Sequence, residues 1–103
     1  MTHDPIVRRE FTIGRDGKRR LEALVYAPVP DRMDFRCDYE IREDGVVTRA
    51  FHAYGVDSMQ AMILALQQLG VDIMMSEHVM KRELYLHGEN KDFGLLLPKS
   101  FTD

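Results

Sequence analysis

The sequence predicts a single α+β domain in which one long helix covers one face of an antiparallel sheet. Stretches of alternating apolar and polar residues dominate the first half of the chain, and Asp-Gly separates the members of two pairs. A run with helical spacing of apolar residues follows, and it is largely free of charge. The predicted order is four strands in a meander, one main helix at about residues 57–75, and a C-terminal hairpin.

The composition fits one cytoplasmic domain. With 103 residues, of which 45% are hydrophobic, the chain is long enough to bury a core of its own. We expect a single domain over residues 1–103, with short loose ends at 1–5 and 99–103. The net charge of −3 gives no argument for binding a polyanion with the whole surface. One cysteine excludes an internal disulfide, and neither a signal peptide nor a membrane span is predicted.

Residues 6–13 and 19–27 are predicted to form the first strand pair. A three-residue loop at 15–17, ending in a glycine of left-handed conformation, places Phe11 opposite Leu21. Apolar side chains then face each other across the two strands, so this register is preferred.

Residues 34–42 and 46–54 are predicted to form the second pair in the same way. A three-residue loop at 43–45 places Cys37 opposite Phe51. A two-residue loop would shift the pairing by one residue and set a histidine opposite the cysteine, so the longer loop is preferred.

Two arginines fall on the apolar side of the predicted sheet. Arg9 and Arg49 occupy positions where the alternation calls for core residues. We interpret them as long side chains whose stems lie over apolar surface while the charged groups stay in water. Inward charges also discourage pairing between exposed strand edges. An anion clamp inside a pocket is the alternative interpretation.

The helix has clear start signals. Asp57 is the predicted N-cap, and Gln60 follows three residues later, as in a capping box. Gly70 either ends the helix or lies inside it where another backbone comes close. The apolar spacing favours continuation to about Met75. The residues expected to cover the sheet are Met59, Met62, Ile63, Leu66, Leu69, Ile73 and Met74.

The stretch GVDSMQAMILALQQLGVDIMMSE, followed after a gap by DFGLLLP, resembles a family of small bacterial proteins that share a domain of unknown function. The resemblance covers roughly the second half of the chain. It implies a compact α+β domain and no particular reaction. The matching positions are Gly55, Asp57, Gln60, Ala61, Ala65, Leu66, Gly70, Gly94 and Pro98.

The end of the chain is predicted to form a hairpin from residues 83–87 and 93–97, with a polar turn at 88–92 between them. Pro98 ends the second strand. Whether this hairpin joins the first or the fourth strand of the sheet is left open by the sequence.

No residue pattern points to catalysis. Cys37 lies on the apolar side of its strand, where a free cysteine behaves as a small hydrophobic residue. The histidines at 52, 78 and 87 fit no metal-ligand motif. Asp38 and Glu40 fall on the wet face and are interpreted as solvated charges. We therefore predict no metal, no cofactor and no enzymatic activity.

The leading functional hypothesis is a non-catalytic protein-interaction module, such as an immunity-like or accessory protein. Its partner would be another protein or a second copy of the chain. The predicted contact residues lie on the outer face of the sheet, with Arg36 opposite His52, and they are of types enriched in binding hot spots. These four residues are Tyr26, Arg36, His52 and Tyr54. The alternative is that the terminal hairpin or the 28–33 loop covers them as a minor core.

Two other surfaces compete for a partner. The uncharged side of the helix is the first, because charged residues are depleted at interface centres; it consists of Gln60, Leu64, Gln67 and Gln68. The second is a basic hairpin tip that would contact nucleic acid or another anion, formed by Arg15, Lys18, Arg19 and Arg20. Aromatic side chains for stacking on bases are missing beside this tip, so we interpret it as a solvated turn.

Overall fold

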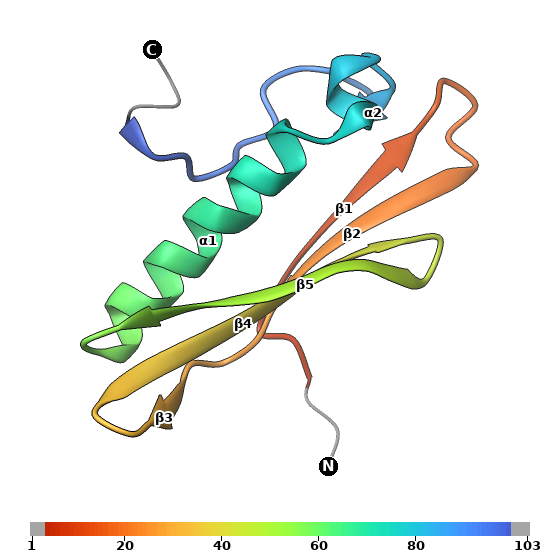
Figure 1. Cartoon of the computed structure of the whole chain (residues 1–103). Helices are drawn as coiled ribbons and strands as arrows, with labels where there is room; N and C mark the ends of the chain where they lie inside the picture. Colours follow the sequence, from red (N-terminus) through yellow and green to blue (C-terminus); the bar gives the residue numbers. More distant parts are fainter. Residues whose placement is uncertain (1–3, 100–103) are drawn as a thin grey trace.

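Two hairpins and one long helix form the body of the domain, which the computed structural model describes for residues 4–99 (Figure 1). The predicted α+β class is confirmed. The strands are β1 (Val7–Ile13), β2 (Arg19–Val25), β3 (Val29–Asp31), β4 (Asp34–Glu43), β5 (Val46–Gly55) and β6 (Leu84–Tyr85), and the helices are α1 (Ser58–Met74) and α2 (Glu77–Met80). Of the loose ends expected at 1–5 and 99–103, residues 1–3 and 100–103 lie outside the described part.

Strand β4 organises the sheet, because it pairs with three other strands. β5 lies along one of its sides, and β2 followed by β3 lies along the other. β1 then pairs with β2, and β6 with β1, so the order across the sheet is β5-β4-β2-β1-β6. All of these pairs are antiparallel, as the predicted meander requires.

The first hairpin has the predicted register. Phe11 lies opposite Leu21, and the loop includes Gly17 in the left-handed region at φ +66°. A glycine adopts this conformation without the steric cost that a Cβ atom would add.

The second hairpin differs from the prediction. Glu43 pairs with Val46, so the loop has two residues, Asp44 and Gly45. Both are left-handed, with φ of +51° and +84°, as a tight two-residue turn requires. Asp is one of the few residues that adopts this conformation readily, and the shorter turn is therefore feasible.

A β-bulge in β5 then returns the side chains of this strand to the predicted faces of the sheet. Ile41 pairs with Arg49 whereas Arg42 pairs with Val47, so Thr48 is an extra residue in β5. Beyond the bulge, the pairing has moved two residues from the predicted register. A shift of two keeps each side chain on its predicted face, because side chains alternate with a period of two.

The predicted contact between Cys37 and Phe51 is consequently wrong. Cys37 lies opposite Ala53, and Phe51 lies opposite Tyr39. Cys37 is nevertheless fully buried in the core of the inner face.

Helix α1 begins as its cap predicts. The carboxylate of Asp57 accepts a hydrogen bond from the Gln60 backbone N–H at 2.7 Å. The Gln60 side-chain oxygen accepts one from the Val56 N–H at 2.8 Å. The Gln60 N–H in the first turn, which has no partner within the helix, and the Val56 N–H just before the helix are thus both hydrogen-bonded.

Gly70 lies inside α1, and another backbone does come close there. A Cβ atom at this position would lie 2.6 Å from the carbonyl oxygen of Leu96. The glycine therefore lets the C-terminal segment, residues 86–99, cross the helix in close contact.

The buried side of α1 is rotated from the predicted stripe. Small residues face the sheet, with Ala61 and Ala65 fully buried, and the side chains of Leu69 and Ile73 continue the row. Met59 and Ile63 are exposed, so their predicted place in the core is wrong. Alanines let the helix axis approach the sheet more closely than methionines would, and this sets the side that is buried.

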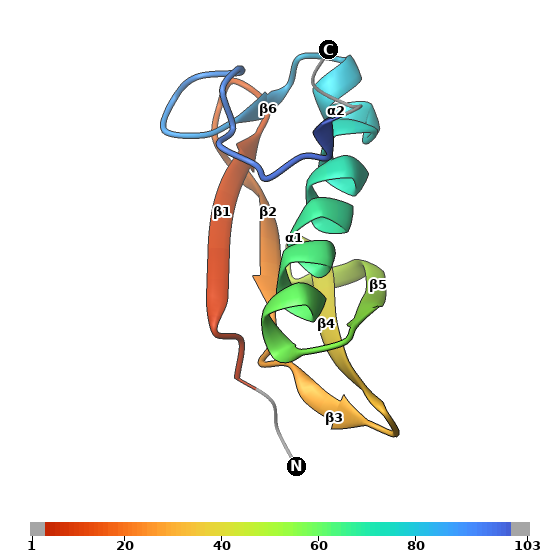
Figure 2. The ribbon, with the colours of Figure 1, turned by 90° about the vertical axis from the view of Figure 1, so that its left-hand side faces the viewer.

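The C-terminal segment covers the part of the inner face that α1 leaves open (Figure 2). Phe93 packs edge-on against Phe11, with ring centroids 5.8 Å apart. The guanidinium of Arg9 donates hydrogen bonds to the carbonyl oxygens of Phe93 at 2.7 Å and Gly94 at 2.8 Å. The segment is thereby tied to β1.

The predicted C-terminal hairpin is wrong. Only Leu84–Tyr85 forms a strand, β6, and it pairs with β1. Residues 93–97 are not a strand, and Gly94 within them and Asp92 just before them have left-handed φ angles. Phe93 is buried and Leu95 packs against the core, so part of this apolar stretch has a core role without the hydrogen bonds of a strand.

Gly70→Ala tests the crossing of helix and C-terminal segment. We expect a loss of about 1–3 kcal/mol in the free energy of unfolding, because the added methyl meets a backbone oxygen that has little room to move. Urea denaturation measures the change, and Gln67→Ala on the same helix is the control. A gain in stability, as alanine gives in an open helix, would contradict the crossing.

Candidate functional site

The outer face of the sheet, opposite α1, carries paired charges rather than a core. Arg8 pairs with Glu22 across β1 and β2. Arg42 donates to Glu40 within β4 at 2.8 Å. Cross-strand and same-face pairs of this kind contribute modestly to sheet stability and hold long side chains in place.

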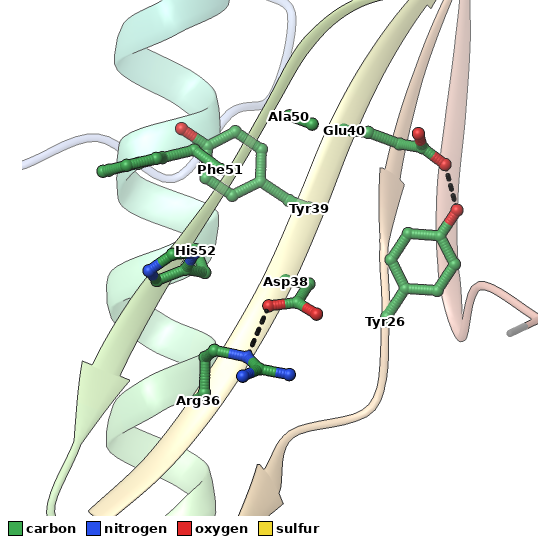
Figure 3. Close-up of a pocket in the computed structure, with 8 residues that line it drawn as sticks. All are labelled: Tyr26, Arg36, Asp38, Tyr39, Glu40, Ala50, Phe51 and His52. Atoms are coloured by element: carbon green, nitrogen blue, oxygen red, sulfur yellow. Dashed lines mark hydrogen bonds and ion pairs between the residues drawn. The ribbon is translucent and has the colours of Figure 1, made fainter. Parts of the chain in front are cut away.

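A shallow hollow of about 500 Å³ lies on this face over β4, between β5 and the residue that follows β2 (Figure 3). We call it the outer hollow. Its lining residues are Tyr26, Arg36, Asp38, Tyr39, Glu40, Ala50, Phe51 and His52.

Arg36 is held on the floor of the outer hollow by two carboxylates. Its Nε donates to Asp38 at 3.0 Å, and its Nη1 lies 3.4 Å from Asp31. The negative charge of Asp38 raises the pKa of Arg36 above its ordinary value. The guanidinium therefore stays charged and has one preferred orientation.

Tyr26 forms the opposite wall. Its hydroxyl donates to Glu40. Burial, together with this hydrogen bond, raises the pKa of Tyr26. The phenol is accordingly a neutral hydrogen-bonding group at physiological pH, and its ring offers an apolar surface.

The β5 side of the site is aromatic. His52 is stacked on Phe51 with centroids 5.0 Å apart, and it meets Tyr54 edge-on at 5.1 Å. Tyr54 is 49% exposed, whereas His52 is half-buried. An edge strand thus presents a row of rings beside the outer hollow.

The structure brings the predicted outer residues together in altered pairs. Tyr26, Arg36 and His52 line one hollow, and Tyr54 borders it. Arg36 lies opposite Tyr54 rather than His52, because of the shift of two residues in β5. The C-terminal segment lies on the inner face, so it does not cover this surface.

Asp38 and Glu40 belong to this site, although the sequence analysis treated them as solvated charges. Each is bound to a hollow-lining side chain, Asp38 to Arg36 and Glu40 to Tyr26. The available signal was the alternation of β4, which puts both acids on the same face as Arg36.

The uncharged helix surface is partly occupied by internal bonds. Gln60 completes the cap, and the side chain of Gln68 donates to Asp72 at 3.0 Å. Leu64 is 40% exposed and Gln67 is half-buried. Gln60 and Gln68, two of the four predicted residues, are therefore hydrogen-bonded within the chain.

The basic hairpin tip is also partly occupied. Arg19 donates to Asp44 at 3.0 Å, and Arg20 pairs with Glu10 at 2.5 Å. Within residues 4–99, the side chains of Arg15 and Lys18 form no ion pair. The structure leaves two of the four predicted cations available.

The second inward arginine is bound to the helix. Asp72 of α1 accepts hydrogen bonds from the Tyr39 hydroxyl and from Arg49 Nε at 3.1 Å. Burial, followed by the bond to Asp72, raises the pKa of Tyr39. Arg9 and Arg49 are exposed, as expected for charged groups in water, and each also binds protein oxygens.

His78 of α2 is buried between two carboxylates. Its exposed fraction is 4%, with Nδ1 lying 2.6 Å from Glu83 and Nε2 lying 2.8 Å from Glu43. Burial of the ring opposes protonation, but the two hydrogen-bonded carboxylates outweigh it and raise the pKa of His78. Both ring nitrogens donate in the charged form, so this geometry fits an imidazolium. The sequence carried no signal that would bring these three residues together.

The described residues can be compared with the requirements of a metal site and of a membrane-spanning helix. Among residues 4–99, no three His, Cys, Asp or Glu side chains are placed to hold a metal ion. Neither helix in that range has the length and apolar character to cross a membrane.

The fold and the outer hollow define a small α+β domain with an open, mixed polar and aromatic sheet face. The chain belongs to the family described as Domain of unknown function (DUF6968), whose model matches residues 7–97. The match runs from the start of β1 into the C-terminal segment, so it extends well beyond the half of the chain that carried the resemblance. No curated protein and no solved structure matches the chain.

Cys37 should behave as a structural thiol. It is fully buried, its Sγ lies 3.3 Å from the Tyr26 carbonyl oxygen, and burial raises its pKa. We expect slow reaction with a thiol reagent in the native protein and rapid reaction in urea. Labelling as fast in the native state as in urea would mean that β4 is not packed as described.

His78 should make stability depend on pH. Its folded-state pKa is raised, so its contribution is complete below the unfolded pKa of about 6.5 and is lost as pH rises through the folded value. We expect the stability difference between wild type and His78→Gln to shrink from pH 6 to pH 9. Urea melts at each pH measure it, and His87→Asn at the exposed turn is the control. A difference that is constant with pH would contradict the charged state of His78.

Proposed function

We propose that the chain is a non-catalytic protein-interaction module, of the immunity-like or accessory kind, that binds its partner with the outer patch. The outer patch consists of Tyr26, Arg36, His52 and Tyr54 around the outer hollow. The observation that carries the proposal is the gathering of these side chains, from three separate segments, on the sheet face that α1 does not cover.

The character of the outer patch supports a protein as the partner. Tyr and Arg are enriched among residues that dominate binding energy at protein interfaces. The hollow is shallow and open, which suits a protruding side chain of a partner. Arg36 is already oriented by Asp38 and Asp31, so less side-chain freedom is lost on binding.

The edge strand beside the patch supports a second copy as one form of that partner. β5 pairs only with β4 among the described strands, and its exposed apolar residues include Val46, Val47 and Phe51. Its one charged residue, Arg49, is bound to Asp72 of the same chain. An edge strand with a single charged side chain has little charge repulsion to oppose pairing with another strand.

The nucleic-acid or anion alternative at the hairpin tip has weaker support. Arg19 and Arg20 are engaged with Asp44 and Glu10, which leaves Arg15 and Lys18. The single buried cysteine, Cys37, is consistent with a cytoplasmic location, which we include in the proposal.

Binding by the outer patch is tested with a partner identified by crosslinking from cells and then purified. Tyr54→Ala and Arg36→Ala should each weaken binding by more than about 1 kcal/mol in calorimetry. Arg15→Ala is the matched control and should bind as wild type does. Urea melts of all three variants show whether folding is preserved.

Two results would count against the proposal. Wild-type affinity in both patch variants would remove the outer patch from the interface. Salt-sensitive binding to nucleic acid that is lost in Arg15→Ala combined with Lys18→Ala would favour the hairpin tip instead.

A further inference from the structure

A second hollow, of about 650 Å³, lies on the other side of the molecule from the outer patch. It is lined by residues of the end of α1, of α2 and of the C-terminal segment, which crosses α1 in Figures 1 and 2. We call it the C-terminal hollow. Its size is within the range of small-molecule sites in proteins.

The interior of the C-terminal hollow is apolar. The five apolar side chains that line it are Met74, Val79, Phe93, Leu95 and Leu97. Met74 is unbranched and adapts to different shapes, which suits a flexible chain. An apolar group of a ligand would be removed from water here, at a gain of about 25 cal/mol per Å².

Two cations stand at the rim without internal partners. Within residues 4–99, the guanidinium of Arg82 and the ammonium of Lys91 form no hydrogen bond or ion pair. By contrast, Arg9, Arg19 and Arg49 all bind oxygen atoms of the chain.

Asp92 also lines the rim, together with the amide of Asn90. The charged groups therefore sum to one positive charge. This favours a ligand with a single negative charge over a dianion.

The backbone at the rim is conformationally costly. Arg82 and Asp92 both have φ of +56°, a region that residues other than glycine seldom adopt. Such conformations persist when surrounding structure holds them, and they are concentrated at ligand-binding sites. Here the Arg9 hydrogen bonds and the contact at Gly70 hold the segment that follows.

We propose that the C-terminal hollow binds a small hydrophobic monocarboxylate, with its apolar chain against Met74, Val79 and Leu95 and its carboxylate between Arg82 and Lys91. Arginine and lysine both form charge-assisted hydrogen bonds with carboxylates. The outer patch takes no part in this binding, so either proposal can fail without the other.

Decanoate is the probe, used below the concentration at which it forms micelles, and decanol is the matched probe without charge. The protein is labelled with ¹³C at methionine methyl groups and titrated while NMR spectra are recorded. We expect a saturable shift of the Met74 methyl signal with decanoate. Met33 and Met59, which are 94% and 72% exposed, report non-specific association and should not shift in parallel.

The charged rim is tested with Arg82→Asn combined with Lys91→Ala. Asparagine tolerates the left-handed backbone at position 82. We expect the double variant to bind decanoate about tenfold more weakly and decanol with unchanged affinity. Arg15→Ala is the control and should match wild type, with folding of all variants checked by the rest of the methyl spectrum.

Three outcomes would overturn the proposal. The first is the absence of any Met74 shift with decanoate. The second is equal affinity of the double variant and wild type for decanoate. The third is a non-saturating shift of Met33 and Met59 together with Met74.

Discussion

The inner face of the sheet is wider than the one helix that covers it, and the rest of the structure depends on this constraint. α1 packs on β4 and β5, and its small residues Ala61 and Ala65 let it lie close. The apolar side chains of β1 and β2 then need a second cover, which the C-terminal segment supplies through Phe93. Gly70 is where the two covers meet, because a side chain there would separate them.

Arg9 and Arg49, the two inward arginines, form polar contacts between the sheet and its two covers. Each joins one cover to the sheet: Arg49 binds Asp72 of α1, and Arg9 binds the carbonyl oxygens of Phe93 and Gly94. Burying part of a charged group is costly unless it is paired or hydrogen-bonded, so these bonds depend on the position of each cover. Breaking one would expose apolar surface and leave a charged group with fewer partners. The two arginines that break the strand pattern therefore link the covers to the sheet through exposed interactions of modest strength.

The covers also separate the two candidate sites. Within residues 4–99 both covers lie on the inner face, so neither of them covers Arg36 and its carboxylate partners on the outer face of β4. The C-terminal hollow lies where the irregular C-terminal segment passes beside the end of α1 and α2. One candidate site belongs to the sheet, and the other is formed largely by an irregular segment.

Much of the fold is determined by short-range signals that the sequence carries by itself. The α+β class, the first hairpin register and the start of α1 at Asp57 follow from alternation, a left-handed glycine and a capping box, which all act within a few residues. The outer face of β4 and β5, and hence the gathering of Tyr26, Arg36 and His52, was also predictable because a strand has a period of two. Only the tertiary structure decided the rest: the bulge at Thr48, the side of α1 that is buried, the cover formed by Phe93 and the bonds of His78 with Glu43 and Glu83. These features depend on tertiary packing. The alternative local conformations differ little in energy by themselves, and contacts with other parts of the chain select one of them.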